Sequence, residues 1–175
     1  MKIYIVNGAA GSGKTTFEDY VCAKIYPYGF KVSTIDFIKK LATQCGWEGT
    51  KTPKDRKMLS DMKDILTEWG DVPIKTVNNA VEDFTYDLIK NDFSITKAVI
   101  FIDCREPEEI EKLKKIYNAK TILVRRESAE KAPTSNHADA NILKFDYDLI
   151  LWNNNSIEDF FNSIDDFMKG ENINA

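Results

Sequence analysis

A glycine-rich stretch near the start of the chain has residue types and spacing that can hold phosphate. Residues 7–16 read NGAAGSGKTT, and residues 8–15 match the pattern GxxxxGKT. Glycines let backbone N–H groups turn toward phosphate oxygens, the lysine reaches the terminal phosphates, and the hydroxyl that follows suits Mg²⁺. This P-loop pattern predicts that ATP and Mg²⁺ bind here; the alternative is a glycine-rich turn that binds nothing. The predicted contacts are Gly8, Ala9, Ala10, Gly11, Ser12, Gly13, Lys14, Thr15 and Thr16.

A second group of charged residues follows the apolar run of VIFIDCREPEEI. Asp103 and Arg105 would lie at the carboxyl end of a buried strand, the edge where open α/β sheets bind ligands. We expect Asp103 to hold Mg²⁺ with Thr15, and Arg105 to bind phosphate and act in catalysis with Lys14. The alternatives are a helix cap for Asp103 and an ion pair with Glu109 for Arg105.

Two further pairs of cations are candidates. Arg125 and Arg126 follow the apolar run 120–124 and could act on the γ-phosphate; the alternative is a solvated pair at a strand end. Arg56 and Lys63 lie seven residues apart, two helical turns on one face, and could bind the phosphate of an acceptor. The alternative for this second pair is a solvated helix face among aspartates.

Polar residues near the end of the chain could contact the base of the donor. Asn153 and Asn154 follow the apolar run 147–152 and could bind the adenine edge; an asparagine-rich turn is the competing interpretation. His137, the one histidine of the sequence, lies in a polar stretch, and we expect it to be a loop contact or a surface residue.

The elements that position these residues can be read from hydrophobic patterning. Apolar runs at 2–6, 97–102, 120–124 and 147–152, with a weaker one at 30–34, predict strands that are covered on both faces. Helical patterns separate them at 14–25, 36–45, 54–69, 74–91, 106–117 and 156–168. The alternation predicts one α/β domain over 1–175, with three layers and a five-stranded, mainly parallel sheet, the architecture of P-loop NTPases.

Two regions depart from a simple alternation of strands and helices. Residues 35–96 contain no convincing strand, and within the stretch 36–93 Met58, Met62, Ile65 and Trp69 recur at helical spacing. We expect a helical insertion that packs against the sheet and binds the acceptor. Residues 125–141 are polar and long for an irregular connection, which predicts a lid.

Composition limits the classes of partner. The formal charge of −4 and 43% hydrophobic residues describe a folded chain that does not attract polynucleotides overall. Three cysteines without CxxC spacing indicate reduced thiols and a cytoplasmic location, and the short first apolar run is neither a signal peptide nor a membrane span. Both a monomer and a homodimer fit the sequence.

Missing motifs narrow the P-loop classes. The chain has neither the NKxD guanine motif nor the DxxG expected of a GTPase, and it has no LSGGQ-like signature of a transport ATPase. Kinases of small molecules are a further class that uses this loop.

The sequence resembles the deoxynucleoside monophosphate kinases of tailed phages and the wider nucleoside monophosphate kinase group. DCREPEE is similar to the DxRxxxE of that family, and IDFIKKLA is similar to its DxxK helix start, which matches Asp36 and Lys39. TPKDRKML resembles a Thr-Pro-Arg-x-x-Leu segment, with Arg56 as the matching arginine if two residues are inserted. YDLILWNNNSIEDF is similar to the closing strand and turn of the family.

The resemblance implies transfer of the γ-phosphate of ATP to a small phosphorylated acceptor, a nucleoside or deoxynucleoside monophosphate. It also implies an acceptor site that includes Asp36, Lys39, Arg56 and Arg105, to which the helical spacing adds Lys63; Asp36 could instead cap a helix. Two alternatives stay open: a P-loop kinase of another small metabolite, and a regulatory protein that binds a nucleotide without turnover.

Overall fold

The fold is built on a central parallel sheet. The computed structural model describes residues 1–131 and 142–174. Its strands are β1 Lys2–Asn7, β2 Gly29–Ser33, β3 Val99–Asp103, β4 Lys120–Arg125 and β5 Leu149–Trp152. They lie in the order β2-β3-β1-β4-β5, and every neighbouring pair is parallel. The carboxyl ends of all five strands therefore meet at one edge of the sheet.

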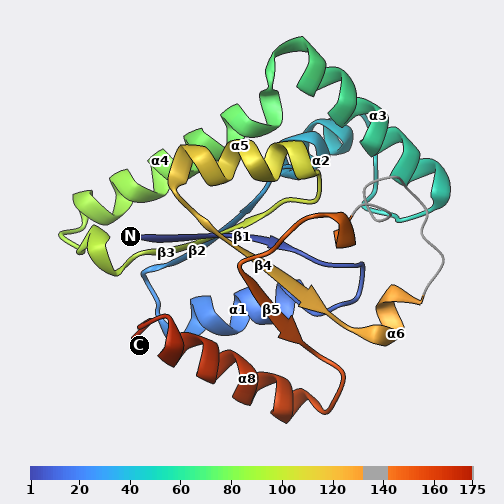
Figure 1. Cartoon of the computed structure of the whole chain (residues 1–175). Helices are drawn as coiled ribbons and strands as arrows, with labels where there is room; N and C mark the ends of the chain where they lie inside the picture. The colour runs from blue at the N-terminus through green and yellow to red at the C-terminus, as the bar shows by residue number, and fades with distance from the viewer. Residues whose placement is uncertain (132–141, 175) are drawn as a thin grey trace.

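Helices cover both faces of this sheet. In Figure 1, α4 and α5 lie over one face, and α1 and α8 lie over the other. The three-layer α/β fold predicted from the sequence is confirmed. The helices are α1 Lys14–Lys24, α2 Asp36–Gln44, α3 Pro53–Gly70, α4 Val72–Lys90, α5 Pro107–Tyr117, α6 Glu127–Glu130 and α8 Ile157–Gly170, with 3₁₀ turns at Ile95–Lys97 and Ile142–Lys144.

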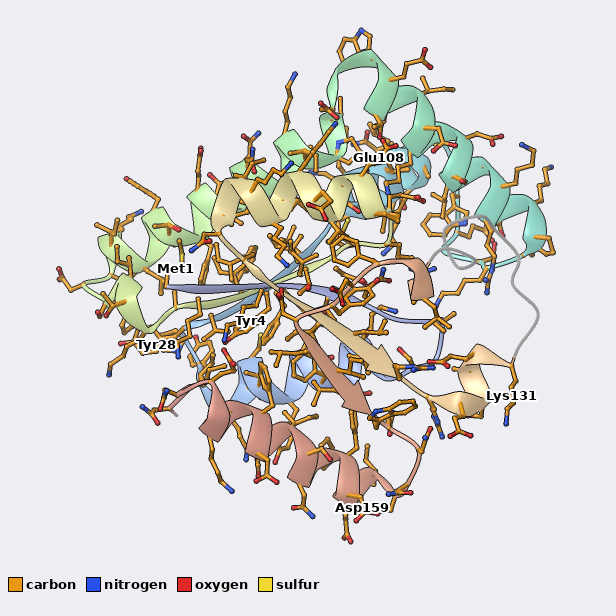
Figure 2. The ribbon with its side chains drawn as sticks, viewed as in Figure 1. Met1, Tyr4, Tyr28, Glu108, Lys131 and Asp159 are labelled. Carbon is orange, nitrogen blue, oxygen red and sulfur yellow. The ribbon has the colours of Figure 1, made fainter. Side chains whose placement is uncertain are left out.

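The strands are apolar throughout because each of their two faces packs on helices. In β1, Tyr4 and Val6 belong to the core on the α1 and α8 side, whereas Ile3 and Ile5 belong to the core on the α4 and α5 side. Side chains of a strand alternate between faces, so a strand covered twice shows no polar alternation. Figure 2 shows Tyr4 inside the molecule, and Tyr4 is 1% exposed.

Most element boundaries lie within two residues of the prediction. The expected strand 97–102 begins later, at Val99, because Ile95–Lys97 forms a 3₁₀ turn. Helices α3 and α8 begin at capping boxes, in which Thr52 pairs with Asp55 and Ser156 pairs with Asp159. Such reciprocal hydrogen bonds satisfy N–H groups that the first helical turn leaves without partners.

The helical insertion contacts the sheet through α4, and the apolar stripe of α3 is buried only in part. Helix α3 packs on α2 and α4, while α4 contacts β2. Met58 and Met62 are half-buried, but Ile65 and Trp69 are 65% and 79% exposed. Since α4 already occupies the place next to the sheet, only part of the stripe finds a partner.

The proposed lid, residues 125–141, is described only in part. Helix α6 lies within the proposed lid 125–141, and residues 132–141, including His137, lie outside the described residues. In the part of the chain that the structure describes, no helix combines the length and the apolar character needed to cross a membrane.

Candidate nucleotide and acceptor site

The glycine-rich loop lies between β1 and α1 and is held close to two neighbouring segments. A Cβ added at Gly8 would overlap the carbonyl oxygen of Val124, at the end of β4. Gly13 has a φ of 108°, and a Cβ there would lie 2.5 Å from Asn153 Nδ2. Both positions therefore require glycine, one through close packing and the other also through its left-handed backbone. The loop is thus fixed between β4 and the turn after β5.

Lys14 is buried over this loop. Its Nζ donates hydrogen bonds to the carbonyl oxygens of Gly8, at 2.7 Å, and Ala9, at 3.3 Å, and Lys14 is only 7% exposed. Helix α1 begins with no side-chain cap and no acidic residue in its first turn. An uncapped helix N-terminus and a buried ammonium together form a site for an anionic group.

Asn7, the last residue of β1, connects the loop to its surroundings. Its Oδ1 accepts a hydrogen bond from the backbone N–H of Gly8 at 2.7 Å. Its Nδ2 donates to the backbone oxygen of Arg105 at 3.3 Å and to the hydroxyl of Tyr147 at 2.7 Å. Burial raises the pKa of Tyr147 to about 12, so the phenol stays protonated at neutral pH. Asn7 therefore holds the loop and the segment after β3 together.

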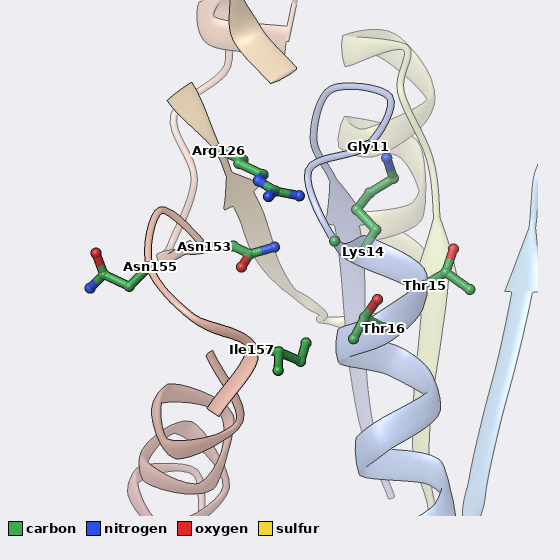
Figure 3. Close-up of a pocket in the computed structure, with 9 residues that line it drawn as sticks. Gly11, Lys14, Thr15, Thr16, Arg126, Asn153, Asn155 and Ile157 are labelled. Carbon is green, nitrogen blue, oxygen red and sulfur yellow. The ribbon is translucent and has the colours of Figure 1, made fainter. Parts of the chain in front are cut away.

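A pocket of about 460 Å³ opens beside the loop. Figure 3 shows Arg126 and Asn153 pointing toward the loop, and Thr15 on the opposite side of α1. Asn153 Nδ2 donates a hydrogen bond of 2.9 Å to the carbonyl oxygen of Ser12, so this asparagine positions the loop. The lining residues are Gly11, Gly13, Lys14, Thr15, Thr16, Arg126, Asn153, Asn155 and Ile157.

The structure separates the two arginines and the two asparagines that the sequence grouped together. Arg126 lines the pocket, whereas Arg125 forms a bidentate ion pair with Glu130 at 2.8 and 2.7 Å. The pairing raises the pKa of Arg125 and lowers that of Glu130. Asn154 accepts a hydrogen bond from the backbone N–H of Glu127 at 2.9 Å. Arg125 and Asn154 thus hold α6 in this arrangement.

Asp103 lies where a cation could bind. Alternation along β3 places it on the same face as Phe101, which packs against Phe17 of α1. Its Oδ1 is buried and accepts no hydrogen bond from the described residues. The cap of α5 is Glu106, so Asp103 does not fill that alternative role. A buried carboxylate oxygen and the hydroxyl of Thr15 are hard oxygen ligands, and they fit Mg²⁺.

Glu18, one helical turn beyond Lys14, was not singled out in the sequence. Glu18 is 4% exposed, and its Oε1 is buried without a hydrogen-bond donor among the described residues. Burial, followed by the charge of Asp103, raises the pKa of Glu18 to about 8; Lys31 and Lys14 act in the opposite direction. Two carboxyl groups therefore interact below the loop. An acidic residue on the buried face of α1 was the available sequence signal.

The predicted acceptor residues at the carboxyl edge have local partners. Asp36 Oδ2 accepts a hydrogen bond from the backbone N–H of Ser33 at 2.8 Å, and Lys39 Nζ lies 3.5 Å from Asp36 Oδ1. Asp36 is the first residue of α2 and not its cap. Arg56 Nε donates to the carbonyl oxygen of Lys51 at 3.2 Å. Arg105 follows β3 and shares the Asn7 contact described above.

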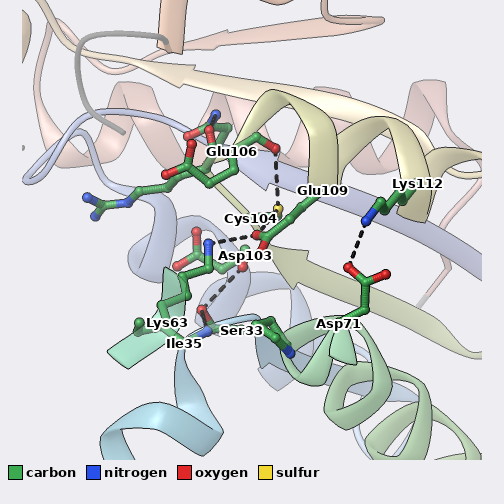
Figure 4. Close-up of polar contacts among 12 residues, drawn as sticks. Ser33, Ile35, Lys63, Asp71, Asp103, Cys104, Glu106, Glu109 and Lys112 are labelled. Atoms are coloured by element: carbon green, nitrogen blue, oxygen red, sulfur yellow. Dashed lines mark hydrogen bonds and ion pairs between the residues drawn. The ribbon is translucent and has the colours of Figure 1, made fainter. Parts of the chain in front are cut away.

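Lys63 is engaged in a buried ion pair. Its Nζ lies 2.7 Å from Glu109 Oε2, and the side chains are 12% and 5% exposed (Figure 4). The thiol of Cys104 also contacts Glu109 Oε2, at 3.4 Å. Burial and the charge of Glu109 raise the pKa of Cys104 well above its usual value, so the thiol stays neutral. The pair joins α3 to α5, which neither of the two interpretations of Lys63 anticipated.

Other contacts were not visible in the sequence. Asn7, Tyr147 and Ile157 carry no motif, and their contacts depend on the sheet bringing distant segments together. Asn155 lines the pocket and belongs to the same asparagine-rich turn as Asn153 and Asn154, so this turn was the available sequence signal.

Comparison with known proteins supports the fold. No family model and no curated protein matches the chain at a significant level. The chain is similar to a dephospho-CoA kinase from Campylobacter jejuni, with a TM-score of 0.52 and 16% identity over 98% of each chain. It is also similar to a shikimate kinase from Bacteroides thetaiotaomicron, with a TM-score of 0.48 and 13% identity over 98% of each chain. At such identities, the first likeness shows a shared fold.

Proposed function

We propose that the chain is an ATP-dependent kinase that transfers the γ-phosphate to a small phosphorylated acceptor, namely a nucleoside or deoxynucleoside monophosphate. The observation that carries the proposal is the continuous pocket from the glycine-rich loop to Arg126 and Ile157. A triphosphate on the loop can extend its nucleoside along that pocket, and the strand-end charges lie at the same edge of the sheet.

The donor half rests on Lys14 and the loop. The carbonyl oxygens that now accept from Lys14 Nζ are neutral, and phosphate oxygens are stronger, charged acceptors. ATP can therefore draw the ammonium toward the β- and γ-phosphates while α1 directs its N-terminus at them. Arg126 is positioned to add a second cation, and its neighbour Arg125 fixes the segment that carries it.

Thr15 and Asp103 are the residues that would hold Mg²⁺. Bound Mg²⁺ would neutralise charge that develops on the phosphate oxygens. Thr15 follows Lys14 at the start of α1, and the buried Oδ1 of Asp103 needs a positively charged or hydrogen-bonding partner. The hydroxyl of Thr15 and the carboxylate of Asp103 are therefore both suited to ligate Mg²⁺.

The acceptor half rests on charge and on the resemblance stated above. Arg105 and the exposed Asp36 and Lys39 follow strands that end at the same edge as the loop. Arginine binds phosphate with two parallel hydrogen bonds, which favours an acceptor that is itself phosphorylated. The solved structure of similar fold is, by its name, a kinase of dephospho-CoA, which supports a small-molecule acceptor.

The transfer itself requires positioning more than covalent chemistry by the protein. An oxygen of the acceptor phosphate attacks the γ-phosphorus, the bond between γ-phosphorus and its bridging oxygen breaks, and ADP leaves. Lys14 and Arg126 stabilise charge on the donor side, and Arg105 orients the acceptor. The products are ADP and a nucleoside diphosphate.

A coupled ADP-release assay tests this function. MgATP is offered with nucleoside and deoxynucleoside monophosphates, with dephospho-coenzyme A as a further arm, and Lys14→Ala is the control. We expect one or more monophosphates to raise turnover well above basal ATP hydrolysis in the wild type only. Stimulation by dephospho-coenzyme A alone would support a kinase but contradict a nucleoside monophosphate as its acceptor. No stimulation by any acceptor would reject the proposed function.

A further inference from the structure

We propose that Glu18 is a second carboxylate of the divalent-cation site, acting with Thr15 and Asp103. This inference rests on the proposed function, because the cation is the one that accompanies the nucleotide. It concerns a residue outside the phosphate-binding pattern, on the buried face of α1.

Backbone geometry brings the three side chains to one place. Side chains on a helix lean toward its N-terminus, so Glu18 extends back toward the turn that contains Thr15, three residues earlier. Asp103 projects from the end of β3 onto the same face of the sheet that α1 covers. Phe17 precedes Glu18, and Phe101 lies two residues before Asp103. The centroids of these two rings are 5.1 Å apart, so α1 and β3 are in contact at this point.

Two buried oxygen atoms in this region lack donors. Glu18 Oε1 and Asp103 Oδ1 each accept no hydrogen bond from residues 1–131 and 142–174. A buried polar atom without a partner costs free energy, and two carboxylates close together add repulsion. A divalent cation removes both costs, because it ligates oxygen and carries opposite charge.

Neither neighbouring lysine donates a hydrogen bond to Glu18 Oε1 or Asp103 Oδ1. Lys31, on strand β2, forms an exposed ion pair with Asp19 of α1. Lys14 Nζ donates to the carbonyl oxygens of Gly8 and Ala9. Mg²⁺ in proteins is bound by one or two carboxylates, with waters and substrate phosphates completing its octahedron. Glu18 and Asp103 supply the two carboxylates of such a site.

Manganese binding provides a test that is separate from turnover. Mn²⁺ is titrated into protein saturated with ADP, and free Mn²⁺ is followed by electron paramagnetic resonance. Glu18→Gln keeps the shape of the side chain and removes its charge; Asp19→Asn makes the same change at the next residue, whose side chain is exposed. We expect Mn²⁺ to bind about tenfold more weakly to Glu18→Gln and unchanged to Asp19→Asn.

Each outcome bears on a different claim. Equal Mn²⁺ affinity in Glu18→Gln and the wild type would show that Glu18 is not a ligand of the cation. Glu18 would then be a buried protonated carboxyl group, and the proposed kinase function would be unaffected. Tight Mn²⁺ binding that depends on Glu18, without phosphate transfer to any acceptor, would reject the kinase alone. A wild type that binds no Mn²⁺ with ADP would overturn both.

Crystals of the wild type with Mn²⁺ and ADP give an answer that needs no variant. We expect the anomalous peak to lie within direct or single-water reach of both carboxylates. A peak contacted by Asp103 and not by Glu18 would contradict the inference.

Discussion

The side-chain amide of Asn153 donates a hydrogen bond of 2.9 Å to the carbonyl oxygen of Ser12. This contact joins the turn after β5 to the glycine-rich loop, which lies 141 residues earlier in the chain. The same amide lies against Gly13, so the turn limits both the position and the residue type of the loop.

Asn153→Ala should loosen the loop. It leaves the Ser12 carbonyl without this donor, so we expect a loss of about 1 kcal/mol in the free energy of unfolding. Weaker ATP binding should accompany that loss. Asn162→Ala is the control, because Asn162 is exposed on α8 and does not line the pocket. Calorimetric titration with ATP and urea denaturation measure both effects, and equal behaviour of the two variants would contradict the assigned contact.

The same turn shows how far the sequence could predict the site. The motif in 8–15 and the apolar strands are local signals, so the fold and the position of the loop at the sheet edge could be predicted from the sequence. The roles of Asn153 and Asn154 depend on Ser12 and Glu127, which only tertiary packing brings near. Hydrophobic patterning carries no information about such polar partners.

Lys63 illustrates the same limit in the acceptor region. Its helical spacing from Arg56 is visible in the sequence, but its ion pair with Glu109 requires α3 and α5 to lie side by side. Spacing on one helix cannot reveal which helix faces it.

The Lys63–Glu109 pair should couple strongly in a double-mutant cycle. Lys63→Met or Glu109→Gln alone leaves a buried group without its partner, and we expect each to cost about 3 kcal/mol of unfolding free energy. The double variant should cost less than the sum of the two. Lys57→Met, in an exposed pair with Asp61, should cost under about 0.5 kcal/mol. Additive losses in denaturant unfolding would show that the two groups do not interact.

Stability in metal-free buffer should fall as pH rises from about 5.5 to 8. Glu18 titrates at about 4.5 as an ordinary glutamate and at about 8 in the folded protein, so over this range the unfolded state has released a proton that the folded state retains. The unfolding free energy then declines by up to about 1.4 kcal/mol per pH unit. Glu18→Gln should flatten the profile, and Asp19→Asn should not. An unchanged slope in Glu18→Gln would contradict the buried environment.

Arg125 and Arg126 should differ despite being neighbours. Arg126→Ala removes a pocket cation, so we expect about a tenfold loss in acceptor-dependent turnover with little change in stability. Arg125→Ala breaks the bidentate pair with Glu130 and should lower the unfolding free energy by about 1 kcal/mol. Steady-state kinetics and thermal unfolding of both variants measure the two effects. Equal losses of turnover and of stability in the two variants would contradict the separate roles.

Transfer of labelled phosphate tests the central claim most directly. The protein is incubated with Mg²⁺, ATP labelled at the γ-phosphate and each nucleoside or deoxynucleoside monophosphate, and the products are separated by chromatography. We predict that label appears in a nucleoside diphosphate with wild-type protein, is lost with Lys14→Ala, and falls far more than ATP binding does with Arg105→Ala. Label found only in inorganic phosphate for every monophosphate would contradict the account.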